Sequence, residues 1–393
     1  SKGDFLGKKR LYENGIFPTK DQKAHFIAAP YKATAELVDA RYPFALNTGR
    51  LRDQWHGMSR TGTIGTLYGH SPEPCVELSP KDAGRMNLTD GDLVHVTSRR
   101  GSEIFPIKVS DDIASSQAFI AMHWGSEFIS GAAGKNPGRG VNGLTCNMID
   151  PVSGQPELKH SAVKILPANL PWQLVAFGLF PKDEVFSIQN SLRIILPEFD
   201  SAQCVLFGRE QDDDLIGVSF KAAHHDDPLK ELESLAVQAL KQVMQKFKLD
   251  EASGNPVMRY SDKRRGIVRL VRAQEKVLSA MLTGPIESLA STAWLRDYLE
   301  IGLDAKTLGR SLLMPVSKPP TEIKSKSKAI CNCFNVSADK MKQCLSKMSA
   351  GTSFDDAMNS LQSETQCGTN CGSCKPEVKQ IIARFLNKVE VVA

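Results

Sequence analysis

Four cysteines near the end of the chain constrain its fold more than any other feature of the sequence. They form a Cys-x-Cys pair, Cys331 and Cys333, and a Cys-x-x-Cys pair, Cys371 and Cys374, with two helical patterns between them. Two cysteines on a tight turn and two more at a helix start make a cage of four thiolates, and Pro376 suits the first turn of that helix. Such a cage holds an iron-sulfur cluster or a zinc ion, although the Cys-x-Cys spacing argues weakly against a zinc ribbon. Disulfides are the third alternative.

The other cysteines are interpreted mainly as core residues. Cys75, Cys146 and Cys204 occur singly among apolar or small residues. Cys344 falls on the apolar face of a predicted helix, which also assigns it to the core. Cys367 lies four residues before Cys371, so counting alone does not exclude it as a ligand.

A glycine-punctuated loop, residues 46–62, combines cations, small residues and planar side chains. Its glycines let backbone N–H groups approach an anion closely, and Trp55 and His56 carry rings that stack on a heterocycle. Three of its residues are forked donors suited to phosphate: Arg50, Arg52 and Arg60. The loop therefore suits a large anionic ligand. The alternative is a polar surface loop with a buried tryptophan.

Short β-rich runs surround this loop and indicate a closed barrel. The predicted strands cover residues 42–46, 75–78, 93–97, 104–109, 118–124 and 161–165. A short helix at residues 79–83 has a proline near its first turn. The last two strands enclose a long glycine-rich loop from Gly125 to Gly143. Several short strands separated by turns are typical of a barrel.

The composition changes at the proline-marked segment 166–171, which is predicted as a domain boundary. Beyond it, two apolar runs at residues 174–177 and 204–207 are predicted as strands. Helical periodicity follows at residues 228–247 and again at 291–303. No known active-site pattern accompanies these elements.

A basic stretch from Arg259 to Arg272 alternates in polarity after Gly266. Its arginines are predicted to face solvent on a strand whose hairpin partner covers residues 277–282. A nucleic-acid patch is the alternative, but no aromatic array or nucleic-acid fold motif accompanies the charges. The net charge of +5 comes from 49 basic against 44 acidic residues. This small, dispersed surplus does not argue for nucleic acid as a partner.

The loop and the cysteine tail resemble parts of a known enzyme family. Residues 47–50 and 52–56, Asn-Thr-Gly-Arg and Arg-Asp-Gln-Trp-His, resemble the start of the cofactor-binding domain of bacterial molybdopterin-dinucleotide oxidoreductases, and most of all assimilatory nitrate reductases. The tail resembles a bacterioferritin-associated-ferredoxin-like domain with a 2Fe-2S cluster. The resemblance implies a mixed, multidomain fold with a six-stranded double-psi β-barrel, an α+β connecting domain and a small helical iron-sulfur domain.

The 393 residues suffice for several domains. The implied organisation is an irregular N-terminal segment at residues 1–40, the dinucleotide-binding barrel at 41–166, the connecting domain at 167–316, a Pro-, Ser- and Lys-rich linker at 317–329, and the 2Fe-2S domain at 330–388. The arginines of the connecting domain would offer a docking face for an acidic redox partner.

The resemblance also implies which residues bind the cofactors. The dinucleotide contacts fall on Asn47, Thr48, Gly49, Arg50, Gln54, Trp55, His56, Gly57, Asn142 and Lys159. The cluster ligands fall on Cys331, Cys333, Cys371 and Cys374, because the family motif Thr-x-Cys-Gly-x-Cys matches residues 369–374; Cys367 is then spare. One departure is Gly-Ala-Ala-Gly-Lys at residues 131–135, where the family often carries an aromatic residue. No catalytic residue is assigned, and His56 and His123 are expected to stack or to hydrogen-bond.

The implied function is the C-terminal portion of a molybdenum-dependent assimilatory nitrate reductase, which converts nitrate to nitrite in the cytoplasm. Its cofactors would be molybdopterin guanine dinucleotide, present as molybdenum bis-MGD in the full enzyme, and the 2Fe-2S cluster. We expect the remainder of the catalytic subunit to supply the metal-ligating side chain and an N-terminal 4Fe-4S site, so the isolated chain should be inactive. A flavoprotein reductase or a ferredoxin is the expected electron donor.

Two alternatives to this function stay open. One is a formate dehydrogenase or another molybdopterin oxidoreductase, because these enzymes share the barrel. The other is a non-enzymatic electron-transfer and docking module. A membrane partner is not expected, because the chain has no apolar run of about 18 residues.

Overall fold

The computed structural model describes residues 11–390 except residues 29, 132–139, 158, 209–213, 231–233, 255, 290–292, 303, 309–311, 315–326 and 350. The chain divides into two compact units, Ser1–Ala35 and Glu36–Ala393. The described residues of the first unit form turns and irregular backbone without a regular helix or strand.

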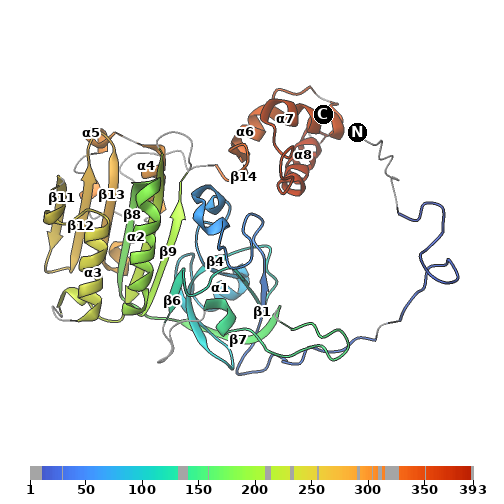
Figure 1. The fold of residues 1–393 in the computed structure, drawn as a ribbon, viewed down its shortest axis with the longest axis horizontal. Coiled ribbons are helices and arrows are strands. Elements are labelled where there is room, and N and C mark those ends of the chain that lie inside the picture. Colours follow the sequence, from blue (N-terminus) through green and yellow to red (C-terminus); the bar gives the residue numbers. More distant parts are fainter. Residues whose placement is uncertain are drawn as a thin grey trace. The chain divides into compact units, whose positions relative to one another are not determined.

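Six strands of the second unit close into a barrel (Figure 1). Their order around the barrel is β1 (Phe44–Gly49), β5 (Gln117–Ala121), β2 (Val76–Leu78), β4 (Ser102–Val109), β3 (Leu93–Thr97) and β7 (His160–Pro167). The pairs β1–β5 and β2–β4 are parallel and the others are antiparallel. Parallel neighbours require crossover connections, so the barrel is not a simple series of hairpins. The predicted six-stranded barrel is confirmed.

Helix α1 (Pro80–Arg85) begins where the sequence predicts it. The Ser79 hydroxyl accepts a hydrogen bond from the Asp82 backbone N–H at 3.1 Å, and Pro80 occupies the first helical position. Both features satisfy or remove donors that a helix N-terminus otherwise leaves unpaired.

A seven-stranded antiparallel sheet follows the barrel. Its order is β11 (Val257–Asp262), β12 (Ile267–Ala273), β13 (Val277–Pro285), β8 (Trp172–Pro181), β10 (Leu215–His224), β9 (Ser201–Phe207) and β6 (Ile129–Gly131). Helices α2 (Lys182–Ile194) and α3 (Leu235–Lys246) lie along one face of it (Figure 1). Helix α4 (Ala293–Ile301) packs on β8 and β13.

Alternate residues of β8 show that both faces of this sheet are covered. Leu174 and Ala176 join the core that contains α2 and α3, whereas Val175 and Phe177 join a second core that contains Trp294 of α4. A strand buried on both faces is apolar without alternation, as this one is. The connecting region is therefore a sheet between helices.

Because both faces are covered, the prediction that the arginines of β12 face solvent is wrong. Arg269 and Arg272 are only 1% and 7% exposed. Arg269 donates a hydrogen bond to the Ser288 carbonyl at 2.9 Å, and the Arg272 Nε donates to the Ser279 hydroxyl at 3.0 Å. Burial lowers the pKa of both guanidinium groups. The predicted hairpin of β12 and β13 is confirmed.

Two other sequence predictions differ from the structure. The glycine-rich loop from Gly125 to Gly143 contains strand β6, which is too short for a local pattern and exists because it pairs with β9. The loop departs from the family pattern at residues 131–135, and residues 132–135 lie outside the described part of the chain. The helix predicted at residues 228–247 starts later, at Leu235, because Ser234 caps it by accepting from the Val237 N–H.

The cysteine tail folds around its own small core. Its elements are β14 (Ala329–Cys331), β15 (Val336–Ser337), α6 (Ala338–Leu345), α7 (Phe354–Thr365) and α8 (Lys375–Glu390). Both predicted helices and the helix start at Pro376 are confirmed, and Cys344 is buried as expected. Most of the predicted linker, residues 317–326, lies outside the described residues.

The remaining elements are short. They are α5 (Ala305–Leu308) and the 3-10 helices η1 (Thr61–Thr63), η2 (Gly65–Tyr68), η3 (Gly140–Gly143), η4 (Leu196–Glu198), η5 (Pro228–Lys230), η6 (Glu251–Ser253) and η7 (Ile286–Ser288). Among the described residues, no helix has both the length and the apolar character needed to cross a bilayer.

Candidate functional site

His123 holds the loop that follows β1. Its Nε2 accepts a hydrogen bond from the Leu51 N–H at 2.9 Å, and its Nδ1–H donates to the His56 carbonyl at 2.5 Å. One nitrogen must accept, so the imidazole is neutral in this arrangement. Burial lowers the pKa of His123 and favours that neutral form. His123 is thus a hydrogen-bonding residue, as the sequence predicts.

The loop exposes the rings of Trp55 and His56, here called the ring shelf, beside the cation of Arg50. The Trp55 side chain is 61% exposed and meets the His56 ring edge-on, with 4.6 Å between ring centroids. The Arg50 guanidinium carbon lies 5.8 Å from the centre of the Trp55 ring. At Gly57 an added Cβ would find no heavy atom within 4 Å, so its backbone is open to a ligand. The alternative of a buried tryptophan in this loop is therefore wrong.

Gln54, a buried residue of the same loop, has an unsatisfied acceptor, its side-chain oxygen. Its Nε2 donates to the Leu67 carbonyl at 3.3 Å, whereas its buried Oε1 has no hydrogen-bond partner in the described part of the chain. Leaving a buried acceptor unpaired costs about 1–3 kcal/mol. A ligand that supplies a donor here would remove that cost, so the residue set fits a polar cofactor.

The strand register brings Lys159 next to β1. Strands β1 and β7 are antiparallel with Asn47 opposite His160, so Lys159, the residue before β7, comes level with Thr48. Asn47 and Lys159 are exposed, whereas Thr48 is buried. The predicted contacts from β1 and from the start of β7 therefore lie at the same end of the barrel.

Asn142 is connected to that end through Trp124. It is an exposed residue of η3, where the Val141 N–H donates to the Trp124 carbonyl at 3.1 Å. Trp124 directly follows His123, which holds the loop after β1. Two of the segments that carry the predicted dinucleotide contacts, the loop after β1 and η3, are thus both held by residues 123–124.

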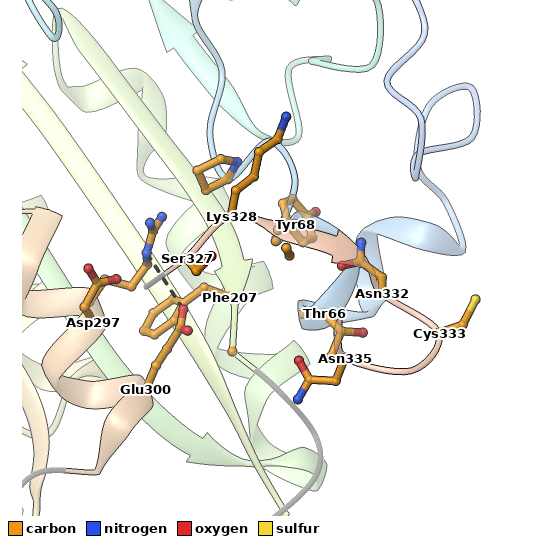
Figure 2. A pocket seen from close by; sticks show the side chains of 16 residues that line it. Thr66, Tyr68, Phe207, Asp297, Glu300, Ser327, Lys328, Asn332, Cys333 and Asn335 are labelled. Carbon is orange, nitrogen blue, oxygen red and sulfur yellow. Dashed lines mark ion pairs between the residues drawn. The ribbon is translucent and has the colours of Figure 1, made fainter. Parts of the chain in front are cut away.

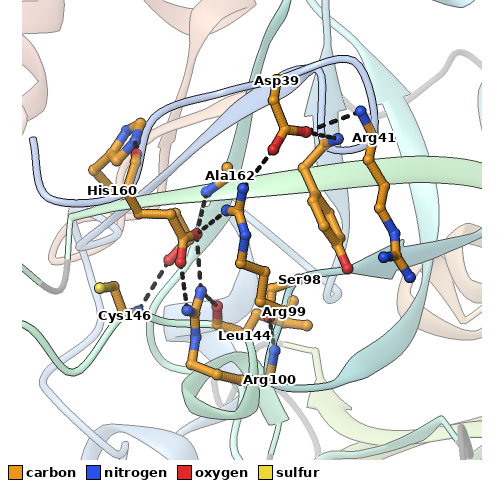
Figure 3. A network of polar contacts seen from close by, with 12 residues as sticks. Asp39, Arg41, Ser98, Arg99, Arg100, Leu144, Cys146, His160 and Ala162 are labelled. Atoms are coloured by element: carbon orange, nitrogen blue, oxygen red, sulfur yellow. Dashed lines mark hydrogen bonds and ion pairs between the residues drawn. The ribbon is translucent and has the colours of Figure 1, made fainter.

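A polar network supports the segment that carries Asn142 (Figure 3). Arg100 donates to both carboxylate oxygens of Glu36, at 2.5 and 3.1 Å, and to the Leu144 carbonyl at 3.0 Å. Arg99 lies 3.5 Å from the same carboxylate. Hydrogen bonding from Arg100 lowers the pKa of Glu36, so the pair is charged at neutral pH. Leu144 follows η3 directly, so this ion pair fixes the backbone beside Asn142.

Arg52 makes contacts that the sequence does not predict. Its Nη2 donates to Asp53 at 2.8 Å, and its Nη1 donates to Glu377 of α8 at 2.7 Å. The Asn332 amide donates to the same Asp53 carboxylate at 2.9 Å. These four residues, here called the Arg52 bridge, link the loop after β1 to the cysteine-bearing domain. Arg52 is therefore engaged by protein carboxylates and is not the free phosphate donor that the sequence indicates.

The Arg52 bridge is largely shielded from solvent. The side chains of Arg52, Asp53 and Glu377 are 16%, 8% and 21% exposed. Burial lowers the pKa of Arg52, but its bonds to Asp53 outweigh that effect and the pKa is raised. Lys328 also reaches Glu377, at 2.7 Å. The only local signal for the Arg52 bridge is the position of Asn332 between the candidate ligands Cys331 and Cys333. The sequence alone does not identify Asp53 as the partner of Asn332.

The four predicted cluster ligands form two pairs of thiols. The sulfurs of Cys333 and Cys371 are 3.3 Å apart, and both residues are exposed. Cys331 and Cys374 are both buried, and their thiols interact with each other. Burial, followed by the neighbouring Cys331, raises the pKa of Cys374 to about 12. A 2Fe-2S cluster takes two protein ligands on each iron, so a donor set of two thiol pairs fits it.

A fifth thiol lies in the same group. Cys367 is completely buried and its thiol interacts with Cys374. The turn before Cys371 is tight, with Gln366 and Gly368 both at positive φ, +56° and +79°. This turn brings Cys367 back toward the buried pair, although the sequence resemblance leaves it without a role.

A cavity of about 390 Å³ opens beside the exposed thiol of Cys333 (Figure 2). It is lined by η2, the end of β9, α4 and the loop after β14. Arg296 and Glu300 of α4, 3.8 Å apart, contribute charged groups on one side, and Asn332 contributes an amide on the other. None of the predicted dinucleotide contacts lines it. The cavity therefore belongs to the surroundings of the cysteine pairs.

Two segments of the chain match known domain families. Residues 44–162 match the Molydopterin dinucleotide binding domain, and residues 329–384 match the BFD-like 2Fe-2S binding domain. The first match covers five barrel strands and the first residues of β7, and the second covers all four predicted cluster ligands. The chain therefore carries a molybdopterin dinucleotide-binding domain and a 2Fe-2S-binding domain, as the sequence resemblance implies.

Over most of its length the chain is similar to two curated nitrate reductases. It is 28% identical to the nitrate reductase of Klebsiella oxytoca, over 93% of this chain and 37% of the relative. It is 26% identical to that of Shewanella frigidimarina, over 94% of this chain and 37% of the relative. The chain also has a shorter match to the F420-dependent formate dehydrogenase subunit alpha of Methanocaldococcus jannaschii. The two are 34% identical over 40% of this chain and 22% of the relative. The chain thus spans 37% of the length of these nitrate reductases.

Proposed function

We propose that this chain binds a molybdopterin guanine dinucleotide at one end of its barrel and delivers electrons to it from a 2Fe-2S cluster, within an assimilatory nitrate reductase. The observation that carries the proposal is the Arg52 bridge. Asp53 of the loop that exposes the ring shelf accepts from Asn332, which lies between the candidate ligands Cys331 and Cys333, and the neighbouring Arg52 donates to Glu377 of α8. One loop therefore contacts both cofactor regions.

At the barrel end, each proposed contact has a distinct task. Trp55 and His56 would stack against a heterocycle, and Arg50 would hold a phosphate. Gly49 and Gly57 would let the backbone approach the ligand. The full proposed set is Asn47, Thr48, Gly49, Arg50, Gln54, Trp55, His56, Gly57, Asn142 and Lys159. His123 would keep the loop in its binding shape without touching the ligand.

At the cluster, we assign Cys331 and Cys374 to one iron and Cys333 and Cys371 to the other. The proximity of the thiols within each pair supports this division. The bound cluster supplies one-electron chemistry, with a potential that burial and nearby charges tune. The exposed pair would face the electron donor, and the buried pair would face Arg52, whose charge acts on Cys374. Electrons would thus enter at the exposed pair and leave toward the barrel.

The proposed electron donor is a cytoplasmic flavoprotein reductase or ferredoxin. Such a donor would approach the exposed thiols of Cys333 and Cys371, next to the cavity of Figure 2. Docking of this kind needs only a modest contact area, because electron-transfer encounters are weak and transient. The remainder of the catalytic subunit would complete the molybdenum site.

Nitrate is the proposed substrate of the complete subunit, because similarity to nitrate reductases extends over nearly the whole chain. The alternative substrate is formate, which the shorter similarity favours. The test is to purify the full-length enzyme with its molybdenum cofactor and to supply nitrate with a reduced dye, or formate with an oxidised one. We expect nitrite from nitrate and no turnover of formate. Formate oxidation without nitrite formation would overturn the assignment of nitrate as the substrate. The present 393 residues, tested alone, are expected to form no nitrite.

Replacement of Arg52 is expected to disconnect the cluster from the barrel while leaving both cofactors bound. The interaction is charge-assisted and mostly buried, so its loss should cost about 1.5–3 kcal/mol of docking free energy. This corresponds to roughly tenfold or more in the docked population. In full-length Arg52→Ala, turnover driven by the protein electron donor should fall about tenfold, whereas turnover driven by a dye that reduces molybdenum directly should hold.

Lys347→Ala is the matched control for Arg52→Ala. Lys347 and Glu364 form an exposed ion pair inside the cysteine-bearing domain, so the substitution removes a charge without crossing to the barrel. It should change neither rate. Equal losses with both electron sources in Arg52→Ala would instead mean that the residue supports dinucleotide binding itself.

A further inference from the structure

Two histidines and an aspartate meet at one end of the seven-stranded sheet, away from the residues discussed above. Strands β9 and β10 are antiparallel with Ser201 opposite Ala223. One residue further along, Asp200 precedes β9 and His224 ends β10, so these two residues lie opposite each other. His225 follows, so a carboxylate and two imidazoles are held together by the sheet itself.

The candidate ligand atoms of the three residues are close together. The Asp200 Oδ2 atom is 2.5 Å from Nδ1 of His225 and 3.8 Å from Nε2 of His224. One ligand atom from each residue can be chosen so that all lie within 4.8 Å of one another. Metal–ligand bonds of about 2.0–2.2 Å place the ligand atoms of a tetrahedral ion roughly 3.4 Å apart. The two observed separations lie on either side of that value.

A second, independent observation is that Asp226 holds the opposite nitrogen of each ring. The Nδ1 atom of His224 is 3.2 Å from both the carbonyl oxygen and the backbone nitrogen of Asp226, and Nε2 of His225 is 3.0 Å from the Asp226 carboxylate. Metal-bound histidines characteristically donate their other N–H to a carboxylate or a backbone carbonyl, which fixes the tautomer and the ring orientation. If both opposite nitrogens donate to Asp226, the remaining nitrogens present lone pairs toward Asp200.

We propose that Asp200, His224 and His225 bind a divalent first-row transition ion of the zinc type, with a water as the fourth ligand. Two imidazole nitrogens and one carboxylate oxygen suit zinc and its neighbours, whereas calcium and magnesium prefer oxygen ligands throughout. The ion would tie the turn after β10 to the start of β9. This site is separate from the cysteine pairs and does not depend on the function proposed above.

The competing explanation is a simple ion pair, with a protonated His225 between Asp200 and Asp226. It accounts for the two short contacts of His225, and in it the Asp226 N–H, which donates to Nδ1 of His224 at 3.2 Å, orients the His224 ring that stacks on that of His225 at 4.4 Å between centroids. An imidazolium bridge binds no zinc. Metal titration therefore distinguishes the two explanations directly.

The test is calorimetric titration of the full chain, purified with its cluster, with zinc chloride. We expect the wild type to bind one equivalent of zinc that His224→Ala and Asp200→Asn do not bind. The comparison is a difference between variants, so zinc taken up by thiols cancels whether or not the cluster is present. Asp226→Ala leaves the three ligands in place and should weaken this equivalent about 10- to 100-fold.

His25→Ala is the matched control, because His25 and Asp21 form an exposed imidazole–carboxylate pair, 2.8 Å apart, without a second imidazole. It should bind zinc like the wild type. Because the His225 side chain is 62% exposed, His225→Ala serves as a ligand variant that disturbs little packing if His224→Ala fails to fold. Identical zinc binding by the wild type, His225→Ala and Asp200→Asn would overturn the proposal.

Discussion

Cys371→Ser is expected to abolish the visible absorption of the 2Fe-2S cluster, whereas Cys367→Ser is expected to retain it. Cys371 is exposed and its sulfur lies 3.3 Å from that of Cys333, so serine at this position removes one of two ligands from the outer iron. Anaerobically purified wild type should be brown and contain about two iron and two sulfide per chain. The variant should contain neither.

The burial of Cys367 makes its replacement the more informative one. Cys367 is fully buried and its thiol interacts with Cys374, so its position does not exclude it from the ligand set. If Cys367→Ser loses the cluster while Cys331→Ser retains it, Cys367 replaces Cys331 as ligand. Cys344→Ser, a buried cysteine on α6, controls for loss of packing. Stoichiometric zinc without sulfide in the wild type would refute the cluster altogether.

The features that can be predicted from this sequence are those that depend on neighbouring residues. Ser79 caps α1 and Pro80 starts it within one turn of chain. Strand β3 occupies the run of five residues that alternation indicates, and its partner β4 follows a turn of four residues. The cysteine spacing likewise predicts that four thiols gather, because two of them precede a helix and two lie on a turn.

The features that cannot be predicted depend on what covers a segment. In β12 the basic stretch suggests a solvent-facing row of arginines, but Arg269 and Arg272 are three residues apart and therefore lie on opposite faces of the strand, where α4 and α3 cover the sheet and bury them. Arg52 looks like a free phosphate donor, yet its partner Glu377 is 325 residues away. Local patterns carry no information about such partners, which tertiary packing alone brings together.

The dinucleotide site is best tested by replacing the exposed Arg50 alongside a matched arginine of the connecting region. A control for an exposed arginine has to be exposed, and the buried Arg269 is not. Replacing it would leave the Ser288 carbonyl without its donor and a void inside the sheet. Arg259, an exposed residue of β11, is the appropriate control because it shares the charge and the exposure of Arg50.

Full-length Arg50→Ala is expected to lose dinucleotide affinity by roughly 30- to 100-fold, whereas Arg259→Ala should bind normally. An arginine that grips a phosphate makes charge-assisted hydrogen bonds worth about 2–3 kcal/mol, and about 1.4 kcal/mol corresponds to tenfold in affinity. Among the described residues, Arg50 contacts the face of Trp55, at 5.8 Å, rather than a carboxylate such as the one that holds Arg52. Its charge therefore remains available for a phosphate.

The measurement is the molybdenum and pterin content of purified full-length variants at equal folded protein. The second dinucleotide and the molybdenum ion would mask part of the loss, so the content should be followed during dialysis, where weaker retention appears as faster release. Iron content is the internal control, because the cysteine-bearing domain has its own core and should keep its cluster in both variants. Full retention of pterin in Arg50→Ala, together with release from Arg259→Ala, would move the site from the loop after β1 to the β11 edge of the sheet. Loss from both variants with normal iron would instead indicate that the dinucleotide depends on the overall charge of this unit and not on one phosphate contact.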